Sequence, residues 1–297
     1  MILDLIYTIT SDRLRLPGVH FIPHKKTDTC LLTVHGMSGS ILENYWADIL
    51  GRESAKAGTA CIYGHNRGYG MISDPAYTDW DSQKHGYKSL RAGEVYERFS
   101  DCVLDIAAWI DTAKKLGHSR IVLFGHSLGG PKVLKYYSAH HPSEVSAVIL
   151  GSPADMPGLV RKDEPRFTER LTEAQDNLKS NQPQKLLSSQ IWDWYHLSSQ
   201  TFLDLFSENG PADVFPVLRN PPDFPELASV TVPLLAFYGE YDDSHVLSSP
   251  RADLDRIKAR ASGSPSISTT IISDANHNYE GREKELADVV LKWLKNL

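Results

Sequence analysis

Apolar residues recur along the chain in short blocks that are separated by longer amphipathic stretches. Blocks rich in β-branched and aromatic residues predict strands at about 19–23, 30–35, 59–64, 120–125, 145–151, 232–239 and 267–273. The clearest predicted helix runs from Glu94 to about Lys115, where apolar residues return on one face. Strands that alternate with helices of this length predict an α/β fold with a mostly parallel sheet and crossover helices.

The alternation stops between about residues 153 and 225. This segment is rich in proline and has amphipathic pieces around 168–179 and 184–208. An excursion this long, placed between two core strands, predicts a helical cap insertion at 153–225 and a core domain formed by 1–152 and 226–297. Trp192 and Trp194 are candidates to line a substrate pocket, and the alternative is that the cap aromatics form a small core of their own.

One predicted strand leads directly into a motif that carries chemistry. Residues Arg120 to Phe124 are followed by Gly125-His126-Ser127-Leu128-Gly129, which matches the G-x-S-x-G nucleophile elbow. A turn from strand to helix within a few residues strains the serine backbone and leaves no room for side chains two positions away. The alternative is an ordinary glycine-rich turn, because a five-residue pattern also occurs by chance.

Two further residues at strand ends complement Ser127. Asp242 follows the predicted strand 232–239, and His277 follows the strand 267–273. The carboxyl ends of parallel strands meet at one sheet edge, and a serine nucleophile needs a histidine base oriented by a carboxylate. The order serine, acid, histidine is that of G-x-S-x-G hydrolases. The adjacent Asp243 competes for the acid role, and the Gly239-x-x-Asp spacing favours Asp242.

Glycine-rich loops follow two earlier strands. The loop after 30–35 is where the first oxyanion donor of such a hydrolase would come from, which predicts the backbone N–H of Met37 together with that of Leu128. His65, after the strand 59–64, is a candidate pocket residue, although a structural histidine is the favoured interpretation.

Composition narrows the class of protein. The 297 residues are 41% hydrophobic and 23% charged, as in globular proteins, and a net charge of −6 disfavours nucleic acid as a partner. The N-terminus lacks a basic region and a cleavage site, so no signal peptide is expected, and no apolar run is long enough for a membrane span. The three scattered cysteines predict buried small side chains without a disulfide framework or metal cluster. A cytoplasmic location fits these features.

The chain resembles the α/β-hydrolase superfamily over nearly its full length. The matching segments are His35-Gly36, Asn66-Arg67-Gly68-Tyr69-Gly70, Gly125 to Gly130, Gly239-Glu240-Tyr241-Asp242 and Asn276-His277. The family often has aspartate where this chain has Asn66. The stretch from Glu97 to Asp105, with the elbow and Lys132, also looks like a subgroup that includes siderophore esterases, whose implied substrates are hydroxamate-siderophore esters.

The resemblance implies a serine carboxylesterase that acts on a small or medium-sized ester through an acyl-enzyme. Ser127, Asp242 and His277 would be catalytic, and no metal or organic cofactor would be needed. A thioesterase, peptidase, C–C hydrolase or acyltransferase with the same three residues is an alternative. A different class, a ligand-binding or signalling protein with little turnover, also uses this fold.

Overall fold

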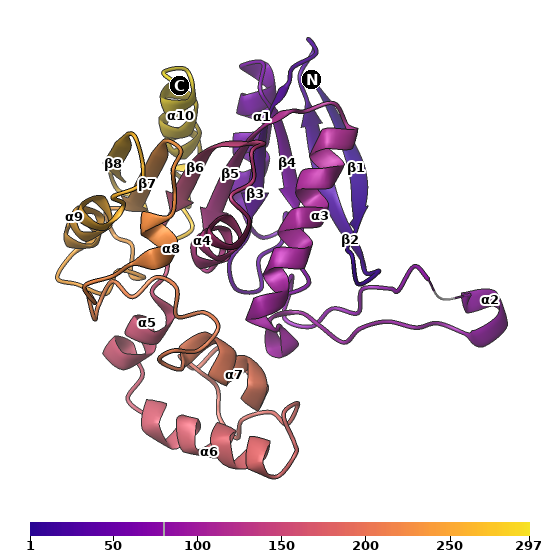
Figure 1. Cartoon of the computed structure of the whole chain (residues 1–297), viewed down its shortest axis with the longest axis vertical. Coiled ribbons are helices and arrows are strands. Elements are labelled where there is room, and N and C mark those ends of the chain that lie inside the picture. Colours follow the sequence, from indigo (N-terminus) through magenta and orange to yellow (C-terminus); the bar gives the residue numbers. More distant parts are fainter. Residues whose placement is uncertain (80) are drawn as a thin grey trace.

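The computed structural model describes residues 1–79 and 81–297. An eight-stranded sheet runs through the molecule in the order β1-β2-β4-β3-β5-β6-β7-β8 (Figure 1). β1 pairs antiparallel with β2, β2 pairs antiparallel with β4, and the other neighbours are parallel. The strands are β1 (Ile2–Ile9), β2 (Arg15–Ile22), β3 (Thr29–Val34), β4 (Ala60–Gly64), β5 (Arg120–His126), β6 (Val145–Gly151), β7 (Leu234–Gly239) and β8 (Ile267–Ile272). The predicted mostly parallel sheet is confirmed.

Helices cover both faces of this sheet (Figure 1). α1 (Tyr45–Lys56) and α10 (Glu283–Leu294) pack on one face, while α3 (Cys102–Lys115), α4 (Gly129–His140) and α9 (Pro250–Arg260) pack on the other. Alternate residues of β5 enter the two apolar layers, with Ile121 and Leu123 on the α4 side and Val122 and Phe124 on the α1 side. This two-sided burial explains why the central strands are continuous apolar runs. All three cysteines are buried, as predicted.

The N-terminal hairpin was not predicted. β1 is absent from the expected strands, and β2 begins at Arg15 rather than near residue 19. β1 is an edge strand whose side chains are mostly exposed, for example Leu5 at 84%. Because only Ile6 and Thr8 are not exposed, β1 lacks the contrast that marks a strand in the sequence, although its β-branched residues and following turn are typical of a hairpin.

The predicted helix from Glu94 to Lys115 is wrong in its first third. Residues Glu94–Tyr96 and Phe99–Asp101 form separate 3₁₀ turns, η1 and η2, with extended backbone between them, and the α-helix begins at Cys102. The Val95 carbonyl accepts hydrogen bonds from Ser198 N (2.9 Å) and Thr201 Oγ1 (3.0 Å), so it is not available to a helix. A distant segment therefore overrides the local periodicity.

The segment between β6 and β7 extends beyond the sheet in Figure 1. It contains α5 (Met156–Asp163), α6 (Phe167–Lys179), α7 (Ser199–Phe206) and the short α8 (Pro225–Ala228). The amphipathic piece at 168–179 forms α6, whereas helix occupies only the last part of the piece at 184–208. Phe202 and Phe206 are fully buried, with ring centroids 5.3 Å apart, and they belong to the apolar cluster on the α3 and α4 side of the sheet.

The remaining helix, α2 (Ser82–His85), lies in an arm that projects from the body in Figure 1. Across residues 1–79 and 81–297, no helix combines the length and apolar character needed to cross a membrane.

Candidate active site

Ser127 occupies a strained turn between β5 and α4. Its φ is 56°, in the left-handed region that non-glycine residues rarely adopt, and its N–H donates to Gly151 O (3.0 Å). A Cβ placed on Gly125 would lie 2.3 Å from the Gly129 carbonyl oxygen, and one on Gly129 would lie 2.0 Å from the Val34 carbonyl oxygen. The steric reason for the two glycines of the motif is therefore present in the structure.

The loop after β3, which we call the 36–38 loop, lies against this serine. A Cβ on Gly36 would be 2.7 Å from Ser127 Cβ, so only glycine permits the approach. Within residues 1–79 and 81–297, neither the Met37 N–H nor the Leu128 N–H donates to a protein acceptor. Free N–H groups beside a serine hydroxyl are suited to stabilising a developing oxyanion.

Asp242 and His277 form a direct pair. His277 Nδ1 lies 3.0 Å from Asp242 Oδ1, and Asp242 is 1% exposed. Burial alone raises the pKa of Asp242, but the His277 charge and the hydrogen bonds from His277, Ser152 and Ser244 hold that pKa well below its usual range. In turn, burial lowers the pKa of His277, but Asp242 outweighs it and raises that pKa. The contact at Nδ1 leaves the Nε2 atom available for proton transfer.

The neighbouring Asp243 has a different environment. It is exposed and lines the cavity, and within the described chain its carboxylate accepts no hydrogen bond from His277. Its charge adds to the rise in the pKa of His277 without touching the ring. The geometry therefore favours Asp242 as the partner of the histidine, as the sequence spacing predicts.

Three residues that support Asp242 and His277 were not predicted from the sequence, namely Ser152, Tyr279 and His126. Ser152 donates to Asp242 Oδ2 and contacts the Tyr279 hydroxyl, so a buried hydroxyl network holds the acid. His126 Nε2 lies 2.9 Å from the His277 carbonyl oxygen, and burial lowers the pKa of His126 to about 3. The neutral His126 ring donates this hydrogen bond and fixes the loop that carries His277. The sequence carried a signal for two of these residues, because His126 is the variable residue of the elbow and Ser152 directly follows a strand end.

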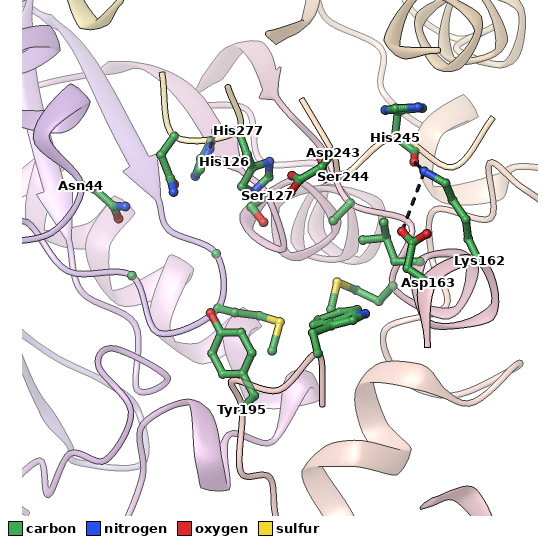
Figure 2. A pocket seen from close by; sticks show the side chains of 18 residues that line it. Asn44, His126, Ser127, Lys162, Asp163, Tyr195, Asp243, Ser244, His245 and His277 are labelled. Atoms are coloured by element: carbon green, nitrogen blue, oxygen red, sulfur yellow. Dashed lines mark hydrogen bonds and ion pairs between the residues drawn. The ribbon is translucent and has the colours of Figure 1, made fainter. Parts of the chain in front are cut away.

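Ser127, His126 and His277 lie at one cavity of about 640 Å³ (Figure 2). Ser127, His277 and Met37 line it, and the segment between β6 and β7 contributes Trp192 and Tyr195 to its lining. Its apolar lining residues include Met37, Ala154, Met156, Leu159 and Trp192, and its polar lining residues include Lys162, Asp163, Asp243, Ser244 and His245.

Two candidates from the sequence lie away from this cavity. Trp194 is 67% exposed and is not among the described residues that line the cavity. His65 is buried, with Nδ1 3.0 Å from Pro17 O and Nε2 accepting from Ile41 N (3.3 Å). It ties β2 to the loop before α1, which agrees with its favoured interpretation as a structural histidine.

Asp242, Asp243 and His277 also bring three possible metal ligands within 4.8 Å of one another. The donor set argues against this use, because Asp242 already accepts hydrogen bonds from Ser244 N (2.9 Å), Ser244 Oγ (2.6 Å) and His277. An acceptor occupied in this way is suited to orienting an imidazole.

Comparisons with known proteins agree with this fold. A family model described as the alpha/beta hydrolase fold matches residues 29–244. No curated protein matches the chain. Among solved structures, Est1E from Butyrivibrio proteoclasticus with ferulic acid bound superimposes with a TM-score of 0.67 at 18% identity, covering 98% of each chain. A thermostable carboxyl esterase from Bacillus coagulans, in complex with glycerol, superimposes with a TM-score of 0.62 at 12% identity, covering 100% of this chain and 99% of the other.

A fungal structure extends this comparison. The alpha/beta hydrolase GrgF from Penicillium sp. sh18 gives a TM-score of 0.65 at 16% identity, covering 100% of this chain and 99% of the other. At such identities the likeness shows the fold alone. None of these matches bears on the siderophore-esterase subgroup, and that resemblance stays a prediction.

Proposed function

This chain belongs to the α/β-hydrolase family, and from that premise we propose that it is a serine hydrolase that cleaves a carboxylic ester through an acyl-enzyme on Ser127. The observation that carries the proposal is that a strained serine, Met37 with its free N–H group and the histidine of a histidine–aspartate pair line one cavity. The free N–H of Leu128 directly follows the serine.

The residues take the following roles in this proposal. Neutral His277 accepts the Ser127 hydroxyl proton as the oxygen attacks the ester carbonyl, and Asp242 stabilises the imidazolium that results. The N–H groups of Met37 and Leu128 hold the oxyanion. His277 then gives the proton to the leaving alcohol. Water attacks the acyl-enzyme by the same route, so the net change is ester plus water to acid plus alcohol.

The mixed lining of the cavity supports a substrate with an apolar and a polar part. Met156, Leu159 and Trp192 are suited to an apolar acyl group, and Lys162 and Asp163, which also line the cavity, are suited to a polar alcohol. Lys162 is held there by its hydrogen bond to His245 O (2.8 Å) and its ion pair with Asp163 (3.8 Å), drawn in Figure 2.

We further propose that residues 153–225 act as a cap that selects the substrate, on the core formed by 1–152 and 226–297. Support comes from Met156, Leu159, Trp192 and Tyr195, which reach the cavity from this segment. Most of the segment's other aromatic residues are buried in the apolar cluster that the segment shares with the core.

The test is hydrolysis of p-nitrophenyl esters of increasing chain length by purified protein. Ser127→Ala should lower turnover by roughly a million-fold, to background, because the covalent path is lost. Ser143→Ala, at an exposed serine, is the matched control and should keep full activity. Both variants should unfold at the wild-type temperature. Activity above about one percent in the Ser127 variant would contradict the proposal.

A further inference from the structure

Three ionisable side chains are buried behind the 36–38 loop, and we call them the charge cluster: Glu94, Glu97 and Lys132. Lys132 Nζ on α4 lies 2.7 Å from Glu97 Oε1, with both side chains 0% exposed. Glu94, in η1, is also fully buried. Taking such charges out of water costs as much free energy as their pairing returns, so stability alone does not explain the cluster.

The cluster holds two carboxyl groups for one cation. Burial and the charge of Glu97 raise the pKa of Glu94, and Lys132 opposes this rise only in part. The resulting pKa of Glu94 is about 8. At neutral pH Glu94 therefore keeps a proton. Its Oε1 meets no donor among the residues that the structure describes, and the proton lets this atom donate to Glu97 instead. With one proton on Glu94, the three side chains together carry no net charge.

The other oxygen of Glu94 reaches the 36–38 loop. Glu94 Oε2 accepts the Ser38 N–H at 3.0 Å. Ser38 has a φ of 49°, and its hydroxyl lies 3.3 Å from the Tyr195 hydroxyl on the segment between β6 and β7. Ser38 directly follows Met37, so the hydrogen bond from Ser38 N to Glu94 holds the turn that carries the Met37 N–H. A non-glycine residue at positive φ is held there by such contacts.

We propose that Glu94 is a positioning residue for ester hydrolysis, which holds the 36–38 loop in its oxyanion-binding conformation through Ser38 and is itself anchored by Glu97 and Lys132. The inference rests on the proposed function. Glu94 does not touch the substrate, so its loss should affect the transition state, where the oxyanion forms, more than substrate binding.

Three substitutions separate the hydrogen bond from charge and volume. Glu94→Gln keeps an acceptor for Ser38 and can donate to Glu97, as the protonated acid does. Glu94→Leu keeps similar volume without either bond. Glu94→Asp keeps the acid but is one methylene too short to reach Ser38. Leu286→Ala, in the apolar layer on the opposite face of the sheet, is a control for general destabilisation.

The measurements are kcat and KM for a p-nitrophenyl ester at pH 7, with the affinity for an arylboronic acid, which forms a tetrahedral adduct with an active serine. We expect Glu94→Leu and Glu94→Asp to lower kcat about 10- to 100-fold with KM within about threefold, and to weaken boronate binding in parallel, because loss of one oxyanion donor costs about 10²–10³. Glu94→Gln should stay within about threefold of wild type, and Leu286→Ala should lower only the melting temperature.

If Glu94→Leu does not fold, the kcat of Glu94→Gln compared with that of Glu94→Asp tests the positioning role. An Asp variant as active as the Gln variant, or a folded Leu variant with unchanged kcat, would overturn the positioning role. The proposed function would still stand in that case, provided that the wild-type protein turns over the ester. A wild-type protein inert towards both the ester and the boronate would overturn the proposed function, and this role with it.

Discussion

The two sides of the cavity hold their groups by opposite electrostatic means. On the side of β7 and β8, Asp242 is buried yet charged, because Ser152, Ser244 and His277 all donate to it. On the side of β3 and α4, Glu94 is equally buried and keeps its proton, because Glu97 lies beside it. Burial raises the pKa of both carboxyl groups, and their partners decide the outcome.

The difference follows from what each side must do in the proposed mechanism. A charged Asp242 can stabilise an imidazolium that forms and disappears in each cycle. A neutral Glu94 can hold a loop without placing a negative charge beside the oxyanion site. The strongest test of the comparison therefore removes the charge on one side and the proton on the other.

The largest effect is expected at Asp242. Asp242→Asn should lower kcat by about four orders of magnitude, because the amide presents a donor to His277 Nδ1 and favours the wrong tautomer. Asp243→Asn, one residue along, should cost less than about tenfold, because Asp243 touches no ring nitrogen in the described structure. Steady-state kinetics of the two purified variants compare them directly. A larger loss at Asp243 would reverse the assignment of the acid.

A smaller effect is expected where the hydroxyl network holds the acid. Ser152→Ala removes one donor to Asp242 but leaves those from Ser244 and His277. Loss of a hydrogen bond to a charged group costs about 1.5–3 kcal/mol, so kcat should fall by roughly 10- to 100-fold with the tautomer of His277 unchanged. A loss as large as that of Asp242→Asn would mean that Ser152 has a role beyond supporting the acid.

The proton on Glu94 predicts a pH dependence of stability. The folded-state pKa of about 8 lies above the usual value of 4.5, so the folded state binds the proton more tightly. The stability from this group is complete below about pH 4.5 and is lost as the pH rises through about 8. Glu94→Gln has no titrating group at this position. As the pH rises from 5 to 9, its melting temperature should therefore increase by several degrees relative to that of wild type. A difference that stays constant with pH would show that Glu94 is already ionised.

The smallest effect concerns the proposed cap, which meets the Glu94 side through Tyr195 and Ser38. Trp192→Ala should change the preference between short and long acyl esters by about three- to tenfold, because Trp192 lines the cavity. Trp194→Ala is the matched control, since Trp194 is 67% exposed and should leave the preference unchanged. Equal preferences in both variants, with a lower melting temperature for Trp192→Ala alone, would make Trp192 a residue of the segment's own interior.

The sequence predicted the parts of the molecule that depend on local pattern. Buried central strands such as β5 are visible as apolar runs, and Ser127 is marked by glycines that the turn requires. The edge strand β1 was missed because most of its apolar side chains are exposed, so apolar and polar positions do not alternate along it. The 3₁₀ turns at 94–101 were predicted as helix because their apolar spacing is helical, while the contact that prevents a helix comes from Ser198, about a hundred residues away.

Within the site, residues that act through another residue were the hardest to predict. Asp242 and His277 follow strand ends in a characteristic order, whereas Ser152 and Glu94 act only because the fold brings them to a carboxylate and a loop. Trp192 and Trp194 are alike in the sequence, but only Trp192 lines the cavity. Trp192 and Asp193 have positive φ values, which accompany the turn between Trp192 and Trp194. The residue types at this turn do not predict it.

The most direct test of the central claim is covalent labelling of the purified protein with a fluorophosphonate, followed by mass spectrometry. The account predicts one adduct per chain, located on the peptide that contains Ser127, absent from Ser127→Ala and formed at least about a hundredfold more slowly in His277→Ala. An adduct on another residue, or equal labelling rates with and without His277, would contradict the account.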